Sequence, residues 1–291
     1  MASRNPAPSE VDARARARQM QVDQQKKARR RRTATIWGAV LAAVLVIGLI
    51  VGFVVKGNQG TEISATGPVP GVVNEEGGVE MTSATALADS GKGERQVDSS
   101  SVAVPETATA PEELTTIPAA GEPANGEPAQ IVVYADFNCV HCAEFESQNS
   151  EQLQSWLKDG KATVEYRMVN FLSAPNNTNY SARSANAAYC VAAAKPEAYN
   201  EFTTGLFMAW EGHGGKGLSD DELIQRADAL GVDIEGCLKD NTYRPAVEWA
   251  TNKAKAAGVA GTPTVFVDGK NWSIDGGDKS FVDWAKPMVE G

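Results

Sequence analysis

Two kinds of apolar pattern divide the chain: one long uninterrupted run near the N-terminus, and short repeating patterns that begin near residue 130. Residues 34–55 form the long run and contain no charged side chain. With a rise of 1.5 Å per residue, a helix over this run is about 33 Å long. A bilayer core is about 30 Å thick, so the run predicts one membrane-spanning helix over residues 34–55.

After residue 130 the order of patterns is strand, helix, strand. Residues 131–135 are β-branched and aromatic, which is typical of a buried strand. Phe145, Trp156 and Leu157 follow at near-helical spacing, and Gly160 ends that segment. Residues 162–169 then predict a second strand. The fold class that this order predicts is α/β.

Helical patterns dominate the next stretch. Four segments carry the apolar spacing or the alanine content of helices: 180–194, 197–210, 219–230 and 245–257. The third opens with SDDE, which predicts a capping box with Ser219 as N-cap and Glu222 reaching back to it. Together they predict a helical subdomain inserted over about 172–258.

Residues 56–126 lack such patterns. They are rich in Gly, Pro, Ser, Thr, Ala and Glu, and no aromatic residue occurs between Phe53 and Tyr134. Such a stretch buries too little apolar surface to offset its ordering entropy, so we expect a flexible stalk. Only a short strand at 78–82 is expected to pack on the globular domain, which we place at 127–291.

Charge orients the chain. Residues 1–32 carry ten basic and three acidic side chains, whereas the whole chain has a net charge of −10. The positive-inside bias puts the basic segment 1–33 in the cytoplasm and the rest outside, as in a single-pass type II membrane protein. A cleaved signal peptide is the alternative and exports the same part. The acidic globular part argues against nucleic acid as a partner.

Two cysteines lie between the first strand and its helix, in the run DFNCVHC. A cysteine at a helix start faces unpaired N–H groups and the positive end of the helix dipole, which stabilise a thiolate. We expect Cys139 to be the exposed attacking thiol and Cys142 the more buried resolving thiol. His141 stabilises the thiolate further by charge or hydrogen bonding. Asp136, three residues before Cys139, could tune it, or could equally serve in the turn or in solvation. This chemistry needs no cofactor and no metal.

Other roles for the four cysteines have to be weighed. A zinc half-site would use Cys139, His141 and Cys142, but closed zinc sites usually need a second close pair. A purely structural Cys139–Cys142 disulfide is another reading. Cys190 and Cys237 lie far apart in the sequence. Of the three pairings that four cysteines allow, we favour 139–142 with a structural disulfide between Cys190 and Cys237 in an oxidising compartment.

A second signature is VAGTPTVFV at 259–267. Pro263, preceded by Thr262, falls where a strand begins, and proline cannot donate to a strand ladder. A cis Thr262–Pro263 bond would explain this position and leave a backbone edge that can pair with a substrate peptide. A trans proline that simply begins the strand explains it equally well.

The strand leading into DFNCVHC, the helix, and the later GTPTVFVDG resemble the thioredoxin superfamily, in particular the DsbA-like thiol oxidoreductases of bacteria, over about 128–291. The resemblance implies a thioredoxin fold with an inserted helical subdomain. It also implies a role for each matching residue: Cys139 as nucleophile, Cys142 as resolving cysteine, His141 as redox-tuning residue, and Pro263 as cis-proline with Thr262 before it. Val140 departs from the family, whose members often have proline there.

The expected function is the introduction of disulfides into exported proteins by Cys139 and Cys142. The expected partners are reduced exported proteins, a membrane redox partner that reoxidises the pair, and the lipid bilayer around 34–55. Reduction or isomerisation of disulfides by the same pair is an alternative. A non-catalytic thioredoxin-like binding module on a stalk is another.

Overall fold

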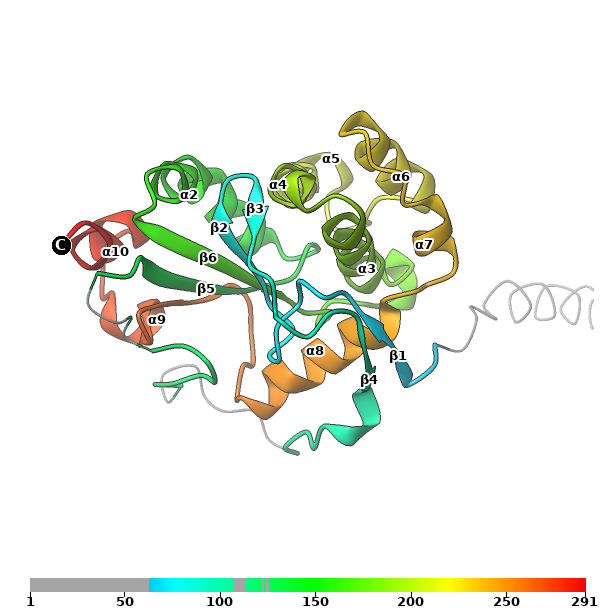
Figure 1. The fold of residues 1–291 in the computed structure, drawn as a ribbon, viewed down its shortest axis with the longest axis horizontal. Coiled ribbons are helices and arrows are strands. Elements are labelled where there is room, and N and C mark those ends of the chain that lie inside the picture. Colours follow the sequence, from blue (N-terminus) through cyan, green and yellow to red (C-terminus); the bar gives the residue numbers. More distant parts are fainter. Residues whose placement is uncertain (1–62, 107–113, 122, 124–125) are drawn as a thin grey trace, which may run out of the picture. The chain divides into compact units, whose positions relative to one another are not determined.

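The computed structural model describes residues 63–106, 114–121, 123 and 126–291 (Figure 1). The basic segment 1–33 and the expected membrane span 34–55 lie outside the described residues. Within those described ranges, no helix is both long and apolar enough to span a bilayer.

A six-stranded sheet forms the centre of the fold, in the order β3-β2-β6-β5-β7-β8. Its strands are β2 (Val79–Ser83), β3 (Ala86–Leu87), β5 (Ala129–Ala135), β6 (Ala162–Met168), β7 (Thr264–Val267) and β8 (Lys270–Asn271). Only β5 and β6 pair in parallel. The helix α2 (Val140–Lys158) connects them, as a parallel crossover requires. The predicted order of strand, helix and strand is confirmed.

Both faces of the sheet are covered, which explains why β5 carries no charged side chain and is buried from Ile131 to Ala135. Successive side chains of a strand point to opposite faces. Ile131 and Val133 therefore face the larger core cluster, to which α2 and α10 (Phe281–Glu290) contribute. Val132 and Tyr134 face a smaller cluster with Ala254 of α8 (Arg244–Ala256). In Figure 1, α2 and α10 lie on one side of the sheet and α8 on the other.

The predicted helical insertion is present between β6 and β7. Its helices are α3 (Tyr180–Ala194), α4 (Tyr199–Met208), α5 (Trp210–His213), α6 (Asp220–Ala229), α7 (Glu235–Lys239) and α8, with 3₁₀ turns at Pro175–Asn177 and Pro196–Ala198. The capping box at Ser219 and Glu222 is confirmed. After β8, the short helix α9 (Trp272–Asp275) precedes α10.

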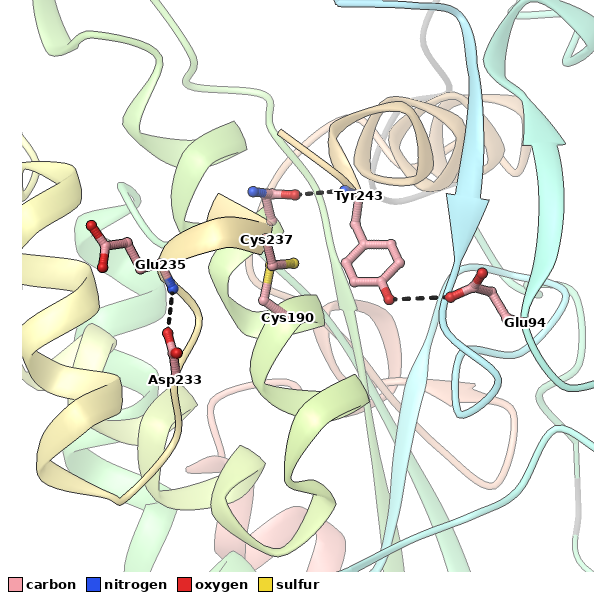
Figure 2. The surroundings of a disulfide bond; sticks show 7 residues. Glu94, Cys190, Asp233, Glu235, Cys237 and Tyr243 are labelled. Carbon is pink, nitrogen blue, oxygen red and sulfur yellow. Dashed lines mark hydrogen bonds between the residues drawn. A yellow bond between two sulfur atoms is a disulfide. The ribbon is translucent and has the colours of Figure 1, made fainter. Parts of the chain in front are cut away.

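The disulfide expected between Cys190 and Cys237 is present and joins α3 to α7 (Figure 2). Close to it, the Asp233 carboxylate accepts the Glu235 N–H at 3.0 Å at the start of α7. On the other side, the Tyr243 hydroxyl approaches Glu94 at 3.5 Å (Figure 2). The disulfide therefore links two helices of the insertion through cysteines that are 47 residues apart in the sequence.

The flexible stalk predicted over 56–126 is wrong for most of the residues that the structure describes. The strand expected at 78–82 is β2, which pairs with β6 in the central sheet. Upstream and downstream of it, β1 (Thr66–Val69) and β4 (Arg95–Asp98) form a second, two-stranded sheet, followed by a 3₁₀ turn at Ser99–Ser101. Val69 and Val73 are completely buried. A few small apolar side chains are enough to hold these segments in place, because they pack against the core formed by the later part of the chain.

A buried ion pair fixes these upstream segments to the sheet. Arg167 on β6 donates to Glu165 at 2.6 Å, and both side chains are 1% exposed. Arg167 also donates to the Tyr134 hydroxyl and to the Pro118 carbonyl, each at 2.8 Å. Glu165 accepts the Asn74 amide at 2.7 Å. Because a buried ion pair is tolerated only when its hydrogen bonds are satisfied, Asn74 and Pro118 belong to the folded domain.

Candidate active site

Cys139 is the N-cap of α2, and Cys142 lies on the first helical turn. The chain is extended at Cys139, with φ −83° and ψ 121°, and turns into the helix directly afterwards. The Cys139 N–H donates to the Asp136 carbonyl at 3.0 Å, which fixes the turn before the helix. Both cysteines are free thiols. The expectation of an exposed Cys139 is wrong: it is only 6% exposed, because Thr262 packs against its sulfur, although it is still more exposed than Cys142 at 1%.

The two thiols have opposite acidities. A hydrogen bond from the Cys142 side chain is the main cause that lowers the pKa of Cys139 to about 5. The Thr262 side chain and the N–H groups of Cys142 and His141 also lower this pKa, while burial opposes them. Burial and the neighbouring Cys139 raise the pKa of Cys142 well above its usual range. At neutral pH the reduced pair therefore holds one thiolate and one thiol.

The second signature folds against this pair. The peptide bond between Thr262 and Pro263 is cis, as one of the two readings of the sequence required. The Thr262 carbonyl lies 3.3 Å from the Cys139 sulfur and accepts its S–H when the thiol is protonated. A cavity of about 180 Å³ at Thr262 and Pro263 is also lined by Leu114 and Asn271. Residues more than a hundred positions apart thus meet at one point.

His141 is exposed and its imidazole lies 2.9 Å from the Glu144 carboxylate. Hydrogen bonding to Glu144 is the main cause that raises the pKa of His141, and the charge of Cys139 contributes less. Toward the Cys139 sulfur, His141 contributes the hydrogen bond of its backbone N–H. The redox-tuning role of its side chain stays a prediction.

Asp136 is a fully buried carboxylate beneath the thiol pair. It accepts the N–H of Asn138 at 2.8 Å and the N–H of Leu172 at 2.9 Å. Burial is the main cause that raises its pKa to about 6. In the sequence, Asp136 was marked only by its position between a buried strand and Cys139. In the structure, Asp136 holds the turn that places Cys139 at the helix start.

Contacts from the helical insertion to this turn were missed by the sequence analysis. The Trp210 indole N–H donates to the Asn138 carbonyl at 2.9 Å, and the Asn138 amide donates to the Gly215 carbonyl at 3.1 Å. His213 fixes the loop that carries Gly215, because its Nδ1 accepts the N–H groups of Gly215 and Gly217, each at 3.2 Å. Nothing local in the sequence marks these contacts.

A further buried acid lies one helical turn after Cys142. Glu146 is 2% exposed, and its carboxylate accepts the Tyr166 hydroxyl. Burial raises the pKa of Glu146 to about 7. For the zinc alternative, no group of three or more His, Cys, Asp or Glu side chains in the described part of the chain is placed to hold a metal ion.

Several known proteins are similar to this chain. A family model described as Thioredoxin matches residues 116–284. Similar solved structures include DsbA from Mycobacterium tuberculosis, 29% identical, covering 58% of this chain and 93% of that chain with a TM-score of 0.47. DsbG from the same organism is 28% identical, covers 66% and 99%, and has a TM-score of 0.47. MdbA from Actinomyces oris is 20% identical, covers 57% and 82%, and has a TM-score of 0.49.

A curated relative is the serine/threonine-protein kinase PknE of Mycobacterium tuberculosis, 28% identical over 149 residues. The match covers 48% of this chain and only 26% of the relative's length. The kinase name therefore describes a protein of which this chain spans about a quarter. The family model, by contrast, covers more than half of this chain and includes both cysteines and the Thr262–Pro263 bond. The chain therefore belongs to the thioredoxin family, and the matched part of the chain carries the thiol pair.

Proposed function

We propose that this protein introduces disulfide bonds into exported proteins outside the cytoplasm. The observation that carries the proposal is the place of Cys139 at the start of α2, next to Thr262. Hydrogen bonds there lower the pKa of Cys139 to about 5, whereas burial raises the pKa of Cys142. A stabilised thiolate lowers the free energy of the reduced pair. The disulfide form of the pair then accepts electrons more readily, which favours oxidation of substrates.

The reaction balances without a bound cofactor. A substrate thiolate attacks the Cys139 sulfur, the Cys139–Cys142 bond breaks, and Cys142 leaves and takes up a proton. The second substrate thiolate then attacks the substrate sulfur of the mixed disulfide and releases Cys139 as a thiolate. The substrate loses two electrons and gains a disulfide, and the pair gains both electrons. A membrane redox partner that accepts two electrons restores the Cys139–Cys142 bond.

The compartment is part of the proposal. An apolar run at 34–55 behind a basic segment favours a single-pass type II anchor with the folded domain outside. A structural disulfide such as Cys190–Cys237 is typical of oxidising compartments and rare in the cytosol. Exported proteins that still carry free thiols are the substrates available there.

The reduction potential of the Cys139–Cys142 pair tests the direction of the reaction. The full-length protein is equilibrated in glutathione redox buffers, and the reduced fraction is read by thiol alkylation and mass spectrometry. A potential near about −120 mV is expected for an oxidant, whereas one near about −270 mV assigns the protein to disulfide reduction or isomerisation. If a Cys139→Ala variant still performs the protein's role in cells, the pair is not catalytic and a binding module is the better description.

A further inference from the structure

A groove beside the thiol pair has no role in the exchange reaction described above. It has a volume of about 320 Å³ and runs between α2 and the α4–α5 segment. We call it the α2–α4 groove. Six of its lining residues carry the argument: Val140, Glu144, Phe207, Met208, Trp210 and Glu211.

The α2–α4 groove adjoins Cys139 on both sides in the sequence. Val140 directly follows Cys139 and lines the groove. Trp210, from the opposite wall, donates its indole N–H to the carbonyl of Asn138, the residue directly before Cys139. A polypeptide whose sulfur is bonded to Cys139 therefore has this groove within reach of the residues next to its cysteine.

The wall formed by α4 is apolar. Phe207 is 1% exposed and stacks on Phe137 with ring centroids 4.7 Å apart, so it belongs to the core. Met208 is 46% exposed, unlike most large apolar side chains of the described residues. Methionine is flexible and polarisable, and such side chains adapt to varied apolar partners. Met208 therefore offers a contact for an apolar side chain of varying shape.

The charge in the groove has one sign. Glu144 and Glu211 are acidic, and the groove is lined by no lysine or arginine. Glu144 is paired with His141. Glu211 is exposed and has no hydrogen-bond or ion-pair partner among the described residues. A basic side chain is the natural complement to this carboxylate, since complementary charge favours association and orients partners.

We propose that the α2–α4 groove binds the stretch next to the reactive cysteine of a reduced polypeptide substrate, and prefers a stretch with an apolar side chain and a lysine or arginine. This inference rests on the proposed function. A second copy of the chain is a poorer occupant, because the residues after 32 carry 34 acidic side chains and only 17 basic ones. Like charges would then face each other across the groove.

Two matched dithiol peptides test the proposal. Both peptides contain leucine and no tryptophan. Their sequences differ at one position, two residues after the first cysteine, where one peptide has lysine and the other glutamate. The oxidised full-length protein is mixed with each peptide at low salt, and the second-order rate of reduction is followed by tryptophan fluorescence. The lysine peptide is expected to react about threefold to fivefold faster, the ratio for an exposed ion pair of up to about 1 kcal/mol. Added salt is expected to reduce the ratio.

Substitutions in the α2–α4 groove test which residues cause the preference for the lysine peptide. Glu211→Gln is expected to bring the rate ratio close to one, and Met208→Ser to slow both peptides equally. Glu201→Gln is the matched control, because Glu201 is an exposed acid on α4 that lines a different depression, with Ala84 and Gln154. All three variants are expected to react with small dithiols, such as dithiothreitol, at the rate of the unchanged protein.

Four outcomes would contradict either the groove proposal or the disulfide-exchange function on which it rests. Equal rates with both peptides, or a preference that persists in Glu211→Gln, would overturn the groove assignment while the exchange function stands. Association of the protein that is lost in Met208→Glu, seen by analytical ultracentrifugation, would assign the groove to a second copy and overturn it too. Failure to oxidise either peptide, with a potential near that of thioredoxin, would overturn the proposed function itself.

Discussion

Cys139 and Cys142 differ at the scale of single residues because one sulfur accepts hydrogen bonds and the other donates. The pKa of Cys139 is about 5 because the Cys142 side chain, Thr262 and two backbone N–H groups donate to its sulfur. Cys142 has the opposite position, since burial and the nearby Cys139 charge disfavour its ionisation. One negative charge is thus confined to one atom, at the start of a helix that stabilises it.

This confinement predicts how the reduction potential changes with pH. Below about pH 5, reduction takes up two protons with two electrons, so the potential falls by about 59 mV per pH unit. Above that pH only Cys142 takes up a proton, and the slope is expected to halve to about 30 mV per pH unit. Equilibration of the pair with a reference redox couple between pH 4 and pH 8 measures both slopes. A slope that stays near 59 mV per pH unit up to pH 8 would mean that Cys139 is protonated there.

Glu146 gives a second prediction at the residue scale. Its folded-state pKa, about 7, is above the ordinary value of 4.5. The folded state therefore holds a proton that the unfolded state releases, and this contribution to stability is present at low pH and lost as pH rises through 7. Between pH 5 and pH 8 the free energy of unfolding of the native protein is expected to fall by about 2 kcal/mol more than that of Glu146→Gln.

Urea unfolding of both proteins at the two pH values measures this difference. Glu201→Gln serves as the control, because Glu201 is exposed. If the native protein and Glu146→Gln lose the same stability between pH 5 and pH 8, Glu146 is ionised in the folded protein at both values.

At the scale of elements, the sequence was informative wherever the signal is local. The strand 131–135 and the capping box at Ser219 were predictable because each rests on residues a few positions apart. The thiol pair and Thr262–Pro263 were recognisable as short motifs. The contact of Trp210 with Asn138 was not, because it joins residues 72 positions apart and depends on how α5 docks. Some of the contacts that position Cys139 therefore come from the insertion, and no local sequence pattern predicts them.

The disulfide between α3 and α7 carries a prediction at this scale. Its two cysteines are 47 residues apart, and a cross-link of that span restricts the unfolded chain. The loop-closure model gives about 4 kcal/mol of stabilisation for such a loop. The double variant Cys190→Ala, Cys237→Ala is expected to lose most of this free energy of unfolding, measured by chemical denaturation. A loss below about 1 kcal/mol would show that packing between α3 and α7 alone holds the insertion together.

At the scale of the whole molecule, the domain begins earlier than its composition indicates. The small and polar residues at 63–106 predict a flexible stalk, yet Val79 and Met81 of β2 are buried against β6. Composition measures how much core a segment could form by itself, and it does not register docking on a core supplied elsewhere. The segment that contains β2 docks because it covers the edge of the sheet. Without β2, the backbone groups along that side of β6 would be unpaired.

Two truncations test where the domain begins. A chain that starts at residue 63 is expected to fold with the thermal midpoint of the full-length protein. A chain that starts at residue 127, the boundary that composition indicates, lacks β2 and the Asn74 amide that bonds Glu165. It is expected to aggregate or to unfold at a midpoint lower by more than about 10 °C, since several kcal/mol of burial are lost. Equal midpoints in differential scanning calorimetry would restore the stalk interpretation.

A point substitution makes the same test without removing any chain. Gly78 lies just before β2, and a Cβ atom there would collide with the buried Glu165 carboxylate. Glu165 cannot yield, because Arg167 holds it at 2.6 Å. Gly78→Ala is therefore expected to lower the free energy of unfolding by about 1–3 kcal/mol, as overpacking does. Gly121→Ala, where a Cβ would meet nothing within 4 Å, is expected to change it little. Were the two variants equally stable in urea, residues near 78 would not be docked on β6, and the active-site sheet would be complete without them.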